Sequence, residues 1–283
     1  MNKNTLVLGG GGLTGIAWMT GILSALEQHD ISPQSFSKAI GTSAGSAVAA
    51  QIYSEVPIGE LYLNQVQSTK QSSEFKPKLN KMWLLFKLLP ALFYWKKPRA
   101  FRKKVAEIAL KRGFELTTQR FEAVKSRLSG DHWHSAVNIV ALNAETGDKA
   151  VFNQSSNVML ADAVTASCAV PLVWPAHKIN GEYFIDGGVR SLNNADLAIG
   201  ADKVLILSPM GEGHGSFPGN NLQQEITLLE SNGAKVFLIT PDLIAKQQMG
   251  KDPLAPEKKS AAAETGLRQG LLIAQQVSQF LSN

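Results

Sequence analysis

Short apolar runs that stop at glycines and continue into helix-spaced apolar positions organise the first fifty residues. The run at 6–8 ends in four glycines at 9–12, and apolar side chains then recur with helical spacing over 16–26. A second run, at 36–40, leads through Gly41 into the small-residue segment 46–52. Two successive strand-to-helix units predict a parallel sheet with helices on its faces.

The same pattern resumes in the second half of the chain. Apolar runs predict further strands at 136–142, 150–152, 183–185, 203–208 and 234–239. We therefore expect one domain over 1–283, a three-layer α/β/α fold with a mostly parallel central sheet. A helix at about 260–283 is expected to dock on that sheet. Its predicted contact face is formed by Leu267, Leu271, Ala274, Val277 and Leu281.

Residues from about 58 to 130 differ in character, being mostly helical, basic and aromatic, and we expect a helical cap or insert there. Between Lys70 and Arg127 lie 16 lysine and arginine residues against four glutamates, a local net charge of +12. Such asymmetry favours an anionic partner, either nucleic acid or lipid headgroups, although a solvated helical face gives the same pattern. The apolar stretch 82–95 is shorter than the roughly 20 residues that span a bilayer, and Pro90 predicts a kink or an end to its helix.

Composition narrows the class of protein. With 44% hydrophobic and 18% charged residues, the chain differs from disordered and fibrous sequences. Its first residues lack the apolar core and cleavage site of a signal peptide, and its one cysteine, Cys168, has no intramolecular disulfide partner. Both features predict a cytoplasmic protein.

The first glycine run admits two interpretations. Gly10–Gly15 matches G-x-G-x-x-G between a strand and a helix, which is the setting of a dinucleotide-binding loop. Such a site also needs an acidic residue at the end of the second strand, yet Asp30 comes before that strand. The strand ends instead in Gly41-Thr42-Ser43-Ala44-Gly45. This favours a catalytic loop over a phosphate-binding one.

That second segment is G-x-S-x-G, in which small neighbours such as Gly41 and Gly45 allow a sharp turn that exposes the Ser43 hydroxyl. A nucleophilic serine needs N–H donors for the oxyanion of its transition state. The glycine loop can supply them, aided by the positive end of a helix expected to begin near Gly15. The predicted donors are the amides of Gly10, Gly11 and Gly12.

The base that activates Ser43 has several candidates. A Ser-His-Asp triad would use a histidine after Ser43, and His177 and His214 are the main candidates beside His132 and His134. Alternatively, Asp186 follows a strand and precedes Gly187 and Gly188, so its carboxyl group can face a serine at a strand end. Burial would raise the pKa of this carboxyl and make it a competent base.

The ordered set GGGGLTG, GTSAG and DGG, with the segment from Ala161 to Ala198, resembles the patatin-like phospholipase family. The resemblance covers roughly residues 5–55 and 136–245. It implies a Ser43–Asp186 dyad without histidine, an oxyanion hole at Gly10–Gly12, no metal or cofactor, and lipid acyl esters as substrates. Two positions depart from it, because Thr14 stands where many relatives carry Arg or Lys and Gly9 replaces a more usual Ser or Asp.

If the protein is a lipid esterase, the aromatic and basic residues at about 82–104 can be interpreted as a surface that binds a membrane. They predict peripheral membrane contact, with rings in the acyl boundary and cations at the headgroups. The alternative is a cap that packs on the domain or lines an acyl pocket. In this interpretation nucleic acid is not an expected partner.

Overall fold

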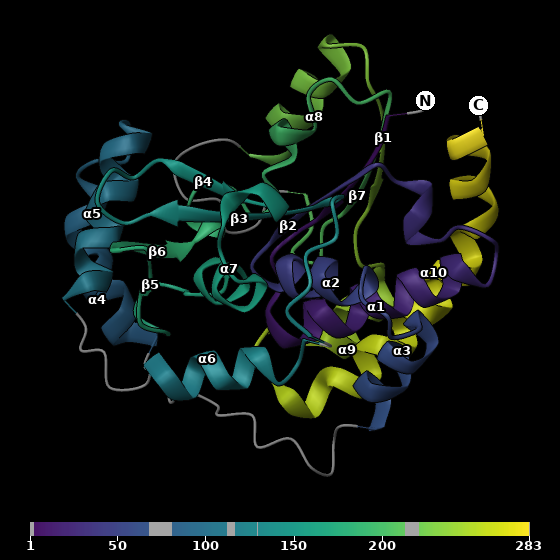
Figure 1. The fold of residues 1–283 in the computed structure, drawn as a ribbon, viewed down its shortest axis with the longest axis horizontal. Coiled ribbons are helices and arrows are strands. Elements are labelled where there is room, and N and C mark those ends of the chain that lie inside the picture. The colour runs from purple at the N-terminus through teal and green to yellow at the C-terminus, as the bar shows by residue number, and fades with distance from the viewer. Residues whose placement is uncertain (1–2, 68–80, 112–116, 129, 213–220, 283) are drawn as a thin grey trace.

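Eight strands form one mixed sheet between two layers of helices in the described part of the chain (Figure 1). This computed structural model describes residues 3–67, 81–111, 117–128, 130–212 and 221–282, and the side chains of 81–85 and 117 are outside the description. The strand order is β5-β6-β3-β2-β1-β7-β8, with β4 paired to β3. The strands are β1 (Asn4–Leu8), β2 (Lys38–Thr42), β3 (Val137–Asn143), β4 (Lys149–Phe152), β5 (His177–Ile179), β6 (Glu182–Asp186), β7 (Lys203–Leu207) and β8 (Lys235–Ile239).

Parallel pairing dominates the centre of the sheet. β1 runs parallel to β2 and β7, and the pairs β2–β3 and β7–β8 are parallel as well. Only the pairs among β3, β4, β5 and β6 are antiparallel. The predicted α/β fold with a mostly parallel sheet is confirmed.

Two strands approach each other end to end along one edge of β3. Thr42, the last residue of β2, pairs with Val140, and Asp186, the last residue of β6, pairs with Ala141. β4 pairs with the same stretch of β3 and therefore lies on its opposite edge. Because β2 is parallel and β6 antiparallel to β3, the residues that follow their ends meet.

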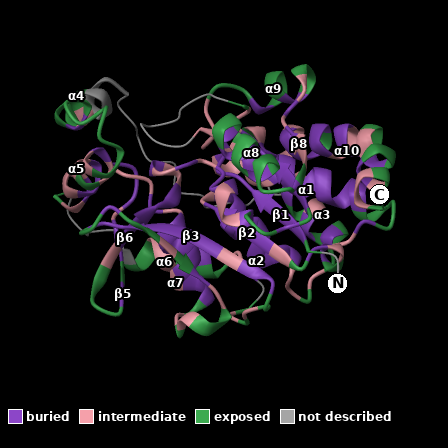
Figure 2. Ribbon diagram, turned by 90° about the horizontal axis from the view of Figure 1, so that it is seen from above, coloured by how far each residue is buried: buried purple, intermediate pink, exposed green. Residues whose placement is uncertain are grey.

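Helices cover both faces of the sheet. On one face lie α1, α2, α3, α6, α7, α9 and α10, and on the other α8 packs over β7 and β1 while α4 and α5 pack near β6. Figure 2 shows the central strands buried and the outer sides of α4, α8 and α10 exposed. The helices are α1 (Gly12–Glu27), α2 (Ala44–Ile52), α3 (Ile58–Gln67), α4 (Lys81–Leu92), α5 (Pro98–Leu110), α6 (Thr117–Lys125), α7 (Leu160–Ser167), α8 (Leu222–Ser231), α9 (Leu243–Met249) and α10 (Lys259–Ser282).

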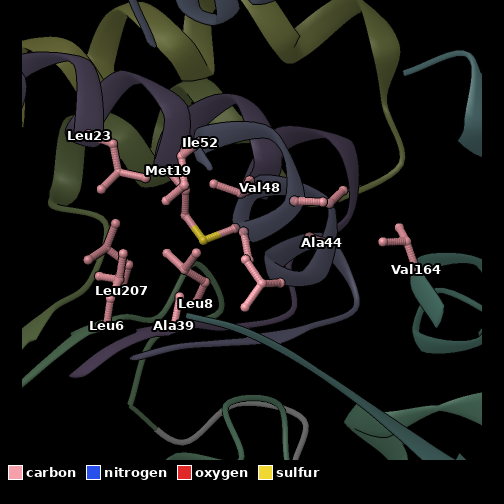
Figure 3. Packing of buried hydrophobic residues seen from close by; sticks show 14 of the residues in the cluster. Leu6, Leu8, Met19, Leu23, Ala39, Ala44, Val48, Ile52, Val164 and Leu207 are labelled. Carbon is pink, nitrogen blue, oxygen red and sulfur yellow. The ribbon is translucent and has the colours of Figure 1, made fainter. Parts of the chain in front are cut away.

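Successive side chains of each strand point to opposite faces of the sheet, so each strand contributes to the core on both faces. Leu6 and Leu8 of β1 belong to the cluster beneath α1 and α2, whereas Val7 faces α8. Figure 3 shows Leu6 and Leu8 packed near Met19 of α1 and Val48 of α2. All of these side chains are fully buried, and each contributes about 1.5–3 kcal/mol of burial free energy.

The C-terminal helix docks partly as predicted. α10 packs mainly on α1, and near its end Phe280 contacts Phe237 of β8 and the Leu281 carbonyl accepts from Lys203 of β7. Of the predicted face, Ala274 and Val277 are buried, whereas Leu271 is exposed. The two helices approach closely through glycines: a Cβ at Gly266 would lie 2.3 Å from the Trp18 carbonyl oxygen, and one at Gly21 would lie 2.2 Å from that of Ala263. Glycines therefore set how closely α10 approaches α1, and part of the predicted apolar face contributes to the core.

The segment expected as a cap is distributed around the domain. α3 packs on α1 and α10, α4 and α5 pack on each other and near β6, and α6 packs on α7. Residues 68–80 and 112–116, which carry part of the basic charge, lie outside the described residues. α4 continues two residues past Pro90, so the proline does not end the helix where it stands. None of the helices within the described ranges has the length and hydropathy needed to cross a membrane.

Candidate active site

Ser43 lies on a strained turn between β2 and α2. Its φ is +52° and its ψ is −117°, a left-handed conformation that non-glycine residues rarely adopt. The turn is tight because its glycines admit no side chain: a Cβ at Gly45 would lie 1.9 Å from the Leu8 carbonyl oxygen, and one at Gly41 would lie 2.6 Å from that of Gly45. Such a turn presents the serine side chain at the end of the sheet.

Three side chains hold the Ser43 backbone in this conformation. The N–H of Ser43 donates to Ser167 Oγ at 2.9 Å, and Ser167 Oγ in turn donates to the Val140 carbonyl at 2.6 Å. The carbonyl of Ser43 accepts from Ser46 Oγ at 2.6 Å and from Cys168 Sγ at 3.2 Å. Sequence reasoning missed the contacts of all three residues, and it considered Cys168 as a cysteine without a disulfide partner.

Asp186 stands at the end of β6 with its carboxyl group facing Ser43. Only 4% of the residue is exposed, and its carboxyl group accepts a hydrogen bond from the N–H of Gly188 at 2.7 Å. The Ser43 side chain lies near enough to act as a further donor that lowers the pKa of this carboxyl. Burial raises the pKa of Asp186 to about 6, although these hydrogen bonds and the nearby Arg120 guanidinium oppose the shift. The group is thus ionised at neutral pH and ready to accept a proton.

The two glycines after Asp186 have different functions. A Cβ at Gly187 would lie 2.5 Å from the Val140 carbonyl oxygen, so this position permits the chain to pass close to β3. A Cβ at Gly188 would lie 2.9 Å from the Asp186 carboxylate, and the N–H of Gly188 orients that carboxylate. Together they fix the direction in which Asp186 points.

The glycine loop lies beside Ser43, but its three amides are not equivalent. The N–H of Gly10 donates to the Leu192 carbonyl at 2.8 Å, so it is already engaged. No acceptor occurs within the described residues for the amides of Gly11 and Gly12. Gly12 has φ +61°, and a Cβ there would lie 2.5 Å from the Pro253 carbonyl oxygen. The free donors are therefore Gly11 and Gly12.

Helix α1 begins at Gly12, earlier than the predicted start near Gly15. The N–H of Gly15 is consequently the first to bond within the helix, to the Gly11 carbonyl at 2.9 Å. This places the positive end of the helix dipole directly at the loop rather than one turn away. Thr14 is buried in that first turn and donates its N–H to the Pro253 carbonyl.

Ser43, Asp186 and the glycine loop open into one largely apolar cavity of about 370 Å³, here called the acyl cavity. α6 contributes Arg120 and Val124 to its wall, and the guanidinium of Arg120 lies 4.2 Å from the centre of the Trp174 ring. The apolar part of the wall is formed mainly by Ile16, Ala47, Val124, Leu128, Val164, Val170, Pro171, Val173, Trp174 and Leu192.

The histidines considered for a triad do not line this cavity within the described residues. His177 is buried and its Nε2 lies 2.7 Å from Asp162 Oδ1, while its ring stacks on Phe121. His132 and His134 are exposed. His214 lies outside the described residues. No group of His, Cys, Asp or Glu suited to hold a metal ion occurs in the described ranges.

A buried polar network lies behind the dyad, and sequence reasoning missed Thr42, Ser191 and Glu225 as its members. Asn194 Nδ2 donates to Thr42 Oγ1 at 3.1 Å and to the Ser191 carbonyl at 2.7 Å, and it reaches the Gly187 carbonyl at 3.4 Å. Glu225 of α8 accepts from the Ala195 N–H at 3.1 Å and bonds the Ser191 side chain. In the sequence, Asn193 and Asn194 after DGG predict side-chain amides that orient the Asp186 loop, although asparagine is also common in turns.

Comparison with known proteins places this site in context. The family model described as "Patatin-like phospholipase" matches residues 6–199, which include the glycine loop, Ser43 and Asp186. Among solved structures, VipD from Legionella pneumophila is similar at a TM-score of 0.45 and 14% identity, covering 97% of this chain and 67% of that one. The type III effector protein ExoU is similar at a TM-score of 0.44 and 19% identity, with 97% of this chain and 53% of that chain covered.

Proposed function

Since the chain belongs to the patatin-like phospholipase family, we propose that it is a serine hydrolase of lipid acyl esters that works with a Ser43–Asp186 dyad. One observation carries the proposal. A serine on a strained turn and a buried carboxyl group whose pKa it lowers line the same apolar cavity, beside unengaged backbone amides. The substrate expected is a lipid whose acyl chain occupies the acyl cavity.

In the acylation step, Ser43 Oγ attacks the carbonyl carbon of the ester and its proton passes to Asp186. The carbonyl oxygen becomes an oxyanion and accepts hydrogen bonds from the amides of Gly11 and Gly12. When the ester bond breaks, the leaving alcohol takes the proton from Asp186, which leaves an acyl-Ser43 ester.

Deacylation repeats these steps with a water molecule as the nucleophile. Asp186 accepts a proton from water as its oxygen attacks the acyl carbon, and the same two amides hold the second oxyanion. Release of the fatty acid returns the proton to Ser43. A base with a pKa of about 6 suits this shuttle, because it is ionised at neutral pH and yet basic enough to accept a proton.

A fluorophosphonate probe, which labels activated serines, tests the dyad. We expect intact mass to show labelling of the native protein, none for Ser43→Ala and much less for Asp186→Asn. His177→Ala and His214→Ala should label like the native protein. Loss of labelling in His214→Ala would favour the triad, and an unlabelled native protein would favour phosphate binding by the glycine loop.

The proposal includes peripheral contact with a membrane through α4 and the turn after it. Ala91 is buried there, but Phe86 is 70% exposed and Phe93 is 92% exposed. Leu89, Leu92 and Trp95 are also exposed, close in sequence to Lys87, Lys96, Lys97 and Arg99. Exposed rings flanked by cations are typical of a surface that enters an anionic lipid interface.

Vesicle cosedimentation tests this contact separately from catalysis. The native protein should bind phosphatidylglycerol vesicles more tightly than phosphatidylcholine vesicles, and the double variant Phe86→Ser/Phe93→Ser should lose most of this binding. Leu243→Ser and Ile244→Ser alter exposed apolar residues of α9 and provide the matched control. Equal loss in both variants would argue against a specific contact surface.

A further inference from the structure

A second cavity adjoins the acyl cavity and differs from it in chemistry. It has a volume of about 570 Å³ and is here called the polar cavity. Met210, Lys251 and Pro253 line both cavities, so the two share a wall. The two cavities therefore lie next to each other, as the apolar and polar ends of one lipid require.

The charges of the polar cavity are unbalanced. Lys246 of α9 and Lys251 of the following loop line it, together with Glu212. Neither ammonium group has an ion-pair partner in the described part of the chain. Two cations against one carboxylate leave a net positive charge, which suits an anionic ligand.

The loop that carries Lys251 is fixed to the catalytic glycine loop. The Pro253 carbonyl accepts the Thr14 N–H at 3.2 Å and lies against Gly12, where a Cβ would meet it at 2.5 Å. Lys251 is two residues away from this contact and is exposed. Because Lys251 also lines the acyl cavity that holds Ser43, its side chain borders the space in which the ester of a bound lipid would lie.

We propose that the polar cavity binds the phosphate-bearing headgroup of the lipid, with Lys246 and Lys251 contacting the phosphate oxygens while the acyl chain occupies the acyl cavity. This inference rests on the proposed function. The acyl cavity is a poorer headgroup site, because its arginines, Arg120 and Arg127, are surrounded by apolar side chains and Arg120 packs on Trp174. Lys246 and Lys251 are thus residues that determine specificity for a phosphodiester over a neutral glyceride.

The test compares two short-chain substrates in monomeric solution, where recruitment to a membrane does not contribute. We expect Lys251→Gln to lower kcat/KM for dihexanoyl phosphatidylglycerol about tenfold, mainly through KM, as one charge-assisted contact is lost. The rate on dihexanoylglycerol should stay within about twofold. Lys246→Gln should also lower kcat/KM for the phosphodiester. Glu212→Gln should lower KM for the phosphodiester, because it removes a charge that repels the phosphate.

Lys235→Gln is the matched control, since Lys235 is exposed at the opposite end of β8. An equal loss on both substrates in Lys251→Gln would overturn the assignment and make Lys251 part of the general site. If Arg127→Gln changes the preference for the phosphodiester over the neutral glyceride and the lysine variants do not, the headgroup lies in the acyl cavity instead.

A binding measurement separates this inference from the catalytic proposal. In Ser43→Ala, glycerophosphoglycerol should bind with an affinity that Lys251→Gln lowers about tenfold, measured by NMR titration. Tighter binding of inorganic phosphate than of this deacylated headgroup would assign the cavity to free phosphate. Failure of the native protein to react with the fluorophosphonate probe, with headgroup binding intact, would reject only the dyad.

Discussion

Asn194 Nδ2 donates a hydrogen bond to Thr42 Oγ1 across 3.1 Å and thereby joins the two chain segments that carry the dyad. Thr42 is the residue before Ser43, and Asn194 also reaches the carbonyl of Gly187, the residue after Asp186. Asn194 is fully buried and has φ +49°. Its side chain therefore fixes the distance between nucleophile and base without touching the substrate.

Asn194→Asp should impair this positioning. The substitution keeps a residue that tolerates a left-handed backbone, but it removes two N–H donors from a buried site. We expect a loss of about 1–3 kcal/mol in the free energy of unfolding, measured in urea, together with slower fluorophosphonate labelling of Ser43. Asn157, at an exposed left-handed position with φ +50°, provides the control variant Asn157→Asp. Native labelling in Asn194→Asp would argue against a positioning function.

Activity should depend on the ionisation of Asp186. Its pKa is raised to about 6, and only the ionised form accepts the Ser43 proton, so kcat/KM should fall as pH decreases through about 6. Hydrolysis of a soluble short-chain ester over pH about 5 to 8 measures this profile. A rate that stays constant down to pH about 5 would contradict the assignment of Asp186 as the base.

Glu225 should make stability depend on pH. Burial raises its pKa from 4.5 to about 7, so the folded protein binds this proton more tightly than the unfolded chain does. The stabilisation is complete below pH 4.5 and is lost as pH rises through about 7. A shift of this size corresponds to about 3 kcal/mol. Glu225→Gln should remove that part of the pH dependence in urea unfolding, and an unchanged slope between the two pKa values would contradict the prediction.

Two glycine-to-alanine substitutions should have opposite effects. At Gly45 a Cβ would lie 1.9 Å from the Leu8 carbonyl oxygen, so Gly45→Ala should prevent the turn at Ser43 from forming and lower the thermal midpoint strongly. At Gly59 of α3 no atom lies within 4 Å of an added Cβ. Gly59→Ala should therefore stabilise the protein by about 0.5–1 kcal/mol. Calorimetry of both variants checks the pair, and equal midpoints would contradict the packing argument.

Ser167→Ala should weaken the turn itself. It leaves the Ser43 N–H and the Val140 carbonyl without their shared partner in a buried site, which costs about 1–3 kcal/mol. We expect lower stability and slower labelling of Ser43 than in Ser126→Ala, where the lost hydroxyl is at the surface. Equal labelling rates in the two variants would show that Ser167 has only a structural effect.

The sequence by itself predicted most strands of the sheet and the two glycine-containing turns that carry candidate catalytic residues. Short continuous apolar runs are a local signal of strands buried on both faces, and the predicted strands recur in the structure with shifts of one or two residues. The short strand β5 was not predicted. The motif GTSAG indicated Ser43, because a tight turn requires small residues beside the serine. The residues alone left the base open between Asp186 and the histidines, and the family resemblance implied Asp186. These inferences needed no tertiary information.

Tertiary structure alone decided how these pieces meet. The opposed directions of β2 and β6 along β3 bring Ser43 to Asp186, and no local pattern encodes that pairing. The engagement of the Gly10 amide by Leu192 depends on a contact between segments 182 residues apart. The same holds for α10, whose glycines permit a close approach to the α1 backbone that the periodic apolar face of the helix did not indicate. Whether two distant backbones fit together depends on both segments at once. A hydropathy pattern describes one segment at a time and therefore does not contain this information.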